Sequence, residues 1–88
     1  MARFLAICSQ PEMNESKFKE ALGGFKKWRP DRWTFVTKAY ACADGKIVAE
    51  CEAREKAHFE QWLMGTGWKV EGIHDVTHIH EAGQIWKM

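Results

Sequence analysis

The sequence predicts an α+β domain made of one antiparallel sheet and a few helices. Three observations predict it. Short runs rich in apolar and β-branched residues recur along the chain, two stretches with apolar residues at helical spacing lie between them, and an Asp-Gly pair joins two of the runs. A chain of 88 residues has room for one hydrophobic core. Residues 1–88 are therefore expected to form a single domain.

A strand and a helix are expected first. Residues 3–9 form a short apolar run that ends at Gln-Pro-Glu, which is typical of a largely buried strand. In "NESKFKEALGGFKKW", apolar residues follow the i, i+3, i+4, i+7 rule and Asn14 can cap the start, so an amphipathic helix is predicted. Each residue of the glycine pair after Leu22 costs about 1 kcal/mol in a helix interior. The helix either ends near Leu22 or continues, weakened, to Trp28.

A hairpin is predicted over residues 33–53. Asp44 and Gly45 separate two alternating segments, which indicates a two-residue type I′ turn that pairs Tyr40 with Ala49. In this register one face is expected to belong to the core and the other to be half open. The expected core face holds Val36, Tyr40, Cys42, Ile47, Ala49 and Cys51, and the other face holds Trp33, Phe35, Thr37, Ala39, Ala41, Val48, Glu50 and Glu52.

A second helix and a closing strand complete the domain. The helix falls within residues 53–67, with a glycine as its C-terminal cap, and residues 73–80 form the strand. With right-handed crossovers, this βαββαβ order gives a four-stranded antiparallel sheet of order 4-1-3-2, with two helices on one face. This is the ferredoxin-like arrangement. Its bare sheet face predicts a homodimer.

Composition excludes several classes. A formal net charge of +1 and mixed charges along the first helix argue against nucleic acid or an anionic membrane surface as the partner. No apolar run approaches a membrane span and no signal-peptide pattern occurs at the start, so we expect no membrane insertion and a cytoplasmic location. Cys8, Cys42 and Cys51 have no Cys-x-x-Cys spacing and are expected to be small buried apolar residues.

The closing strand "GIHDVTHIH" carries the candidate metal site. Period-2 alternation places His74, His78 and His80 on one face, turned away from the helices. His78 and His80 are about 6.6 Å apart and could share nickel, zinc or copper, whereas His74 lies about 13 Å from His78 and joins them only if a bulge intervenes. Further ligands would come from Cys8, Glu50, Glu52, Glu81 or a second copy. Alternatively, the histidines only supply hydrogen bonds or a pH-sensitive dimer contact.

The chain resembles a family of small bacterial ferredoxin-like domains that are known as nickel-binding proteins of unknown physiological role. The resemblance rests on length, element order, the "DGKIVAECEA" hairpin leading into a helix, and the "GIHDVTHI" strand. It implies a homodimeric sheet and a metal ion held by His74, His78 and His80. A second resemblance, to dimeric α/β-barrel domains that include cofactor-free monooxygenases, concerns the fold alone.

Two other functions stay open at this level. The five tryptophans exceed what a small core readily buries, so the bare sheet face could dock a partner protein through Trp33, Phe35 and Trp86. A small enzyme with a pocket between sheet and helices is the other alternative, but the sequence offers no recognisable catalytic set. Whether the protein is an enzyme is left undecided, and a binding role is favoured.

Overall fold

The computed structural model describes residues 2–87 as a four-stranded sheet, three helices and a separate two-stranded hairpin. The strands and helices follow one another as β1 (Ala2–Ser9), α1 (Glu15–Leu22), α2 (Phe25–Trp28), β2 (Thr34–Ala41), β3 (Lys46–Ala53), α3 (Lys56–Thr66), β4 (Lys69–Asp75), β5 (His78–Glu81) and β6 (Gln84–Lys87). The predicted mixture of helices with a four-stranded antiparallel sheet is confirmed. The six-element order was wrong, because α2, β5 and β6 are additional.

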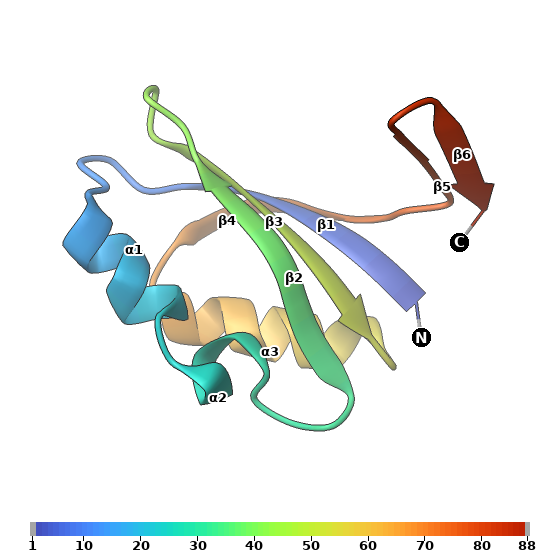
Figure 1. The fold of residues 1–88 in the computed structure, drawn as a ribbon. Helices are drawn as coiled ribbons and strands as arrows, with labels where there is room; N and C mark the ends of the chain where they lie inside the picture. The colour runs from blue at the N-terminus through green and yellow to red at the C-terminus, as the bar shows by residue number, and fades with distance from the viewer. Residues whose placement is uncertain (1, 88) are drawn as a thin grey trace.

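The four long strands lie in the order β2-β3-β1-β4, and all neighbours are antiparallel. All three helices cover the same face, and the other face is open (Figure 1). β1 and β3 are the two central strands, and their eight residues pair from end to end. The most buried part of the sheet is therefore built from residues far apart in the sequence.

The core lies between the sheet and α3. Alternate residues of β1 and β3 point into it, as the period of a strand requires. Phe59 and Leu63 of α3 are fully buried against them, and Trp68 closes the core just after the helix. The fully or nearly fully buried apolar residues are Phe4, Ala6, Cys8, Val36, Ile47, Ala49, Cys51, Ala53, Phe59, Leu63 and Trp68.

The first helical segment breaks at the glycine pair. The Asn14 side chain accepts a hydrogen bond from the Lys17 amide at 2.9 Å and caps α1, as predicted. α1 then ends at Leu22, and a side chain at Gly23 would collide with the Lys19 carbonyl. The chain restarts as the single turn α2 and reaches Trp28 in a new direction. Of the two predicted outcomes, the earlier helix end is confirmed.

The β2–β3 turn differs from the predicted two-residue loop. The Gly45 amide donates to the Cys42 carbonyl at 3.1 Å, and the Cys42 amide donates to the Lys46 carbonyl at 2.8 Å. The loop therefore contains three residues, and only Gly45, with φ of 87°, has the positive φ that a type I′ turn would require of Asp44 as well.

This longer loop moves the strand register by one residue. Tyr40 pairs with Val48 on the open face, and Ala39 takes the predicted place of Tyr40 opposite Ala49. Tyr40 is 54% exposed and Cys42 is exposed, so their assignment to the core was wrong. A register shift between Val36 and Lys38 returns Val36 to the core.

The predicted closing strand is interrupted. β4 ends at Asp75, and after two residues the chain enters β5, which pairs only with β6. The hairpin of β5 and β6, hereafter the arm, projects beyond the end of the main sheet (Figure 1). Its two-residue turn has φ of 52° at Ala82 and 86° at Gly83, the positive values of a type I′ turn. The prediction of one continuous strand over residues 73–80 was thus wrong.

None of the helices within residues 2–87 combines the length and the apolar character that a membrane crossing requires.

Candidate functional site

The structure separates His74 from the other two predicted metal ligands. His74 lies on β4, opposite Leu5 of β1, on the open face of the sheet. Its ring lies over Gly72. A Cβ atom at position 72 would be 2.9 Å from Nε2 of His74. Since β4 ends one residue later, His74 belongs to the main sheet and not to the arm.

His78 and His80 lie on one face of the arm and both are exposed. The alternation of β5 places their rings on the same side, and Nδ1 of His78 lies 3.0 Å from the Thr77 hydroxyl. Across the arm, His80 pairs with Ile85 and His78 with Lys87. Within residues 2–87, no group of three or more histidine, cysteine, aspartate or glutamate side chains is placed to hold one ion.

The other predicted ligands point elsewhere. Cys8 is fully buried on the helix-facing side of β1, and burial raises the pKa of its thiol. Glu50 lies on the open face of β3, where one of its oxygens pairs with Arg3 at 3.0 Å. The structure thus brings neither of them to His78 and His80. Glu81 alternates with His80 and points to the opposite face of β5.

An ion cluster occupies the open face near the end of the sheet. The Arg3 guanidinium bridges Glu50 and Glu52, and the hydroxyl of Thr37 donates to the Glu50 carbonyl at 3.2 Å. Burial by itself lowers the pKa of Arg3, but the hydrogen bonds to the two carboxylates outweigh this and raise it. Both carboxylates are thus engaged by Arg3 on the sheet.

The rest of the open face is mixed in character. Half-buried Leu5, Ile7 and Val48 lie at its centre beside exposed Tyr40. Lys46 and Glu71 form an ion pair. This face therefore combines an apolar centre with charged surroundings.

Trp33 and Phe35, two of the aromatic residues predicted for the open face, pack against neighbouring rings, and Phe35 pairs with Glu52 across the strands. Trp33 packs against His58 of α3, with ring centroids 6.1 Å apart. The ring centroids of Phe35 and Trp28 are 5.5 Å apart. The Arg29 guanidinium lies over the Phe35 ring, with its Cζ atom 5.0 Å from the ring centroid. Trp33 is 40% exposed and Phe35 is half-buried, so solvent still reaches both rings. The side chain of Trp86 lies outside the described part of the chain.

The three cysteines are free, and their environments differ. Cys42 is exposed at the β2–β3 turn, whereas Cys8 and Cys51 are buried. Burial raises the pKa of the Cys51 thiol to about 12. Cys51 is consequently a protonated, inert core residue at neutral pH.

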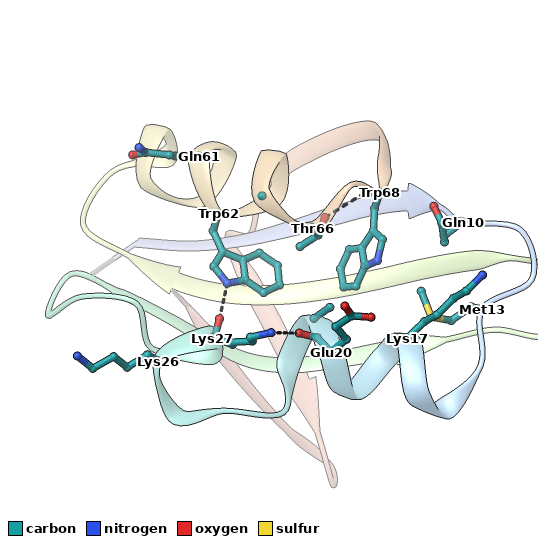
Figure 2. A pocket seen from close by; sticks show the side chains of 12 residues that line it. Gln10, Met13, Lys17, Glu20, Lys26, Lys27, Gln61, Trp62, Thr66 and Trp68 are labelled. Carbon is teal, nitrogen blue, oxygen red and sulfur yellow. Dashed lines mark hydrogen bonds between the residues drawn. The ribbon is translucent and has the colours of Figure 1, made fainter.

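A cleft of about 650 Å³ between α1, α2 and α3 was not predicted as a site. Trp62 and Trp68 project into it, and Figure 2 shows them beside lysines and a glutamate from the opposite wall. Its lining residues are Gln10, Met13, Lys17, Glu20, Ala21, Lys26, Lys27, Gln61, Trp62, Gly65, Thr66 and Trp68. The described lining contains neither cysteine nor histidine, so it offers no Cys–His pair for covalent catalysis. The surplus of tryptophans is the sequence signal that could have found it.

Comparison with protein-family models, with curated proteins and with solved structures finds no match for this chain, and the resemblance to nickel-binding domains therefore stays a prediction.

Proposed function

We propose that this chain is a small homodimeric protein that binds a divalent transition metal, nickel or zinc, between the arms of two copies. The observation that carries the proposal is the exposed pair His78 and His80 on one face of a projecting hairpin. Imidazole nitrogen is a ligand that both metals accept, and two imidazoles two residues apart on a strand can converge on one ion.

The number of ligands supports a site shared by two chains. Among the predicted ligands in residues 2–87, one copy brings together His78 and His80 but not Cys8, which is buried on the sheet, or Glu50, which is held by Arg3. A two-fold axis through the ion doubles the number of ligands. The site then has four imidazoles, and four is the coordination number that zinc prefers in a tetrahedral site. His74 is not required in this arrangement.

The arm itself supports pairing. A two-stranded hairpin is marginally stable in water unless it packs on something else. The strands of the arm are four residues long, and Ile85 is 68% exposed. Because His80 and Ile85 are cross-strand partners, they share a face. A contact that brings the imidazoles of two copies together would therefore also bury Ile85.

Calorimetric titration with Ni²⁺ and with Zn²⁺ tests the metal site, and sedimentation velocity tests the dimer. We expect one ion per two chains, a metal-dependent dimer, and loss of both with His78→Ala plus His80→Ala. The matched control is His74→Ala, which we expect to bind as the unaltered chain does. Binding weaker than about 100 μM, or binding that the double variant retains, would contradict the proposal.

A partner protein on the open face of the sheet is the second candidate. It is favoured by exposed Tyr40 beside half-buried Ile7 and Val48, an apolar centre that solvent still reaches. Sedimentation of the metal-free chain separates the two ideas. If the metal-free chain is a dimer and Val48→Lys dissociates it, then a second copy, and not a partner protein, covers this face.

The ferredoxin-like description of residues 2–75 is part of the proposal. The strand order β2-β3-β1-β4 and the location of the helices on one face support it. In this description α2 and the arm are additions to the basic unit.

A further inference from the structure

We propose that the cleft between α1 and α3 binds a small organic anion with a flat apolar body, of the class of aromatic carboxylates. This site is distinct from the arm, and its function does not depend on the metal. The proposal rests on the shape of the cleft, on its two indole rings and on its charge.

The cleft has the size and the walls of a small-molecule site. Its volume of about 650 Å³ falls within the range of about 300–1,000 Å³ that is usual for ligand pockets. The indole rings of Trp62 and Trp68 meet nearly at right angles, with an interplanar angle of 80° and centroids 5.8 Å apart. Met13, just before α1, lines the same space (Figure 2). A flat ring can therefore stack on the half-buried indole of Trp62 and meet the edge of the Trp68 indole.

Both indole rings are held in place by the core. Trp68 is only 7% exposed and stacks with Phe18 at a centroid distance of 6.4 Å. Trp62 stacks on buried Phe59 at 6.1 Å, and its indole N–H donates to the Lys27 carbonyl. Rings that are already oriented lose little conformational entropy when a ligand arrives.

The charge of the lining favours an anion. Lys17, Lys26 and Lys27 lie around the cleft, and Glu20 is the one acidic residue in its described lining. The three lysines and one glutamate give the lining a net charge of +2, which is larger than the net charge of +1 of the entire chain. A positively charged cleft concentrates anions near its apolar floor.

The lysines are free to meet a carboxylate. Among the described residues, none of the three forms an ion pair. Nζ of Lys27 donates to the Glu20 carbonyl, and Nζ of Lys17 lies 3.5 Å from the Glu12 carbonyl. Each ammonium group has three donors, so these contacts leave donors for a ligand. A carboxylate with an aromatic body would satisfy both the ammonium groups and the indole rings.

Three probes that share one ring system separate the contributions. Binding of 2-naphthoate, 2-naphthalenemethanol and 2-naphthylmethylammonium is followed by NMR through the Trp62 and Trp68 indole N–H signals. We expect 2-naphthoate to bind at least about tenfold more tightly than the ammonium compound, a difference of about 1.4 kcal/mol, with the alcohol between them. Equal affinity of the anion and the cation, or no shift of either indole signal, would overturn the proposal.

Two sets of variants locate the site. Lys17→Gln plus Lys26→Gln should weaken 2-naphthoate severalfold and leave the alcohol unchanged, whereas Lys56→Gln, on exposed α3 surface outside the cleft, should change neither. Trp62→Leu should weaken all three probes, with thermal unfolding confirming that the variant is folded. The proposal is wrong if the double lysine variant binds 2-naphthoate normally. We expect the variant His78→Ala plus His80→Ala to bind 2-naphthoate as the unaltered chain does. This outcome would show that the cleft binds its ligand independently of the proposed metal site.

Discussion

The two hairpins of this protein form in different ways. The β2–β3 hairpin has strands of eight residues, packs its core face against α3, and is flanked by β1. The arm has strands of four residues that pair only with each other. Yet the arm has the type I′ turn, and the longer hairpin has a three-residue loop with a single residue at positive φ, Gly45.

The comparison shows that packing outweighs turn chemistry. The Asp-Gly pair favours a type I′ turn, but such a turn would pair Tyr40 with Ala49 and bring a large polar ring to the helix-facing side of the sheet, beside Leu22 and Trp28. The longer loop places small Ala39 there instead. In the arm no core imposes a register, and the two-residue turn forms even though its first position is Ala82, with φ of 52°.

The largest expected difference between the hairpins comes from one substitution made in each. Ile47→Ala removes a fully buried side chain of β3 and should lower the free energy of unfolding by about 2–5 kcal/mol. Ile85→Ala in the exposed arm should change it by less than about 0.5 kcal/mol. Urea unfolding of dilute, metal-free protein measures both. Similar losses in the two variants would mean that the arm is packed on another surface.

A second pair of substitutions compares the turns. Gly45 and Gly83 have φ of 87° and 86°, so an alanine at either position costs about 1–2 kcal/mol. For Gly45→Ala the loss should appear in global unfolding. For Gly83→Ala it should appear only as faster amide hydrogen exchange in residues 78–87. Gly65→Ala, in α3 where an added Cβ meets nothing within 4 Å, is the control and should not destabilise.

A third substitution should strengthen the arm. Ala82→Asn puts a residue that tolerates positive φ at the first turn position and creates the Asn-Gly pair typical of type I′ turns. The gain of about 1 kcal/mol should slow amide exchange in the arm about fivefold, with the midpoint of global unfolding unchanged. A raised midpoint would show that the arm unfolds together with the main sheet.

The smallest effect is confined to alkaline pH and to the β2–β3 hairpin. The unfolded Cys51 thiol loses its proton near its ordinary pKa of 9.0, whereas burial keeps it protonated in the fold up to about 12. Between these values the folded chain holds more protons than the unfolded chain, so stability falls as pH rises. Cys51→Ala should therefore lose less stability than the unaltered chain from about pH 8 to about pH 9, a difference of less than about 0.5 kcal/mol.

Local signals made much of the fold predictable. Asn14 marked the start of α1, the glycine pair its end, and Gly67, with φ of 79°, the end of α3. Each of these positions is decided by a few neighbouring residues. The first strand and the four-stranded antiparallel sheet also followed from the apolar pattern and from general handedness.

Features that depend on distant residues were not predictable. One extra loop residue reassigned Tyr40 and Cys42, because a one-residue slip turns a strand over. The break after Asp75 separated His74 from His78, although the alternation of the sequence continues through it. The cleft combines side chains from α1, α2 and α3, and no single segment shows its charge or its paired indole rings.

The contact between Gly72 and His74 has a consequence for how these two positions can vary. The imidazole occupies the space that any side chain at position 72 would need, and Nε2 would lie 2.9 Å from a new Cβ atom. Because the atom that a new Cβ would meet is the tip of an exposed side chain, a substitution at position 72 should displace the His74 ring without moving the backbone. Glycine at position 72 therefore decides where the His74 ring lies over the open face, and not whether the sheet forms.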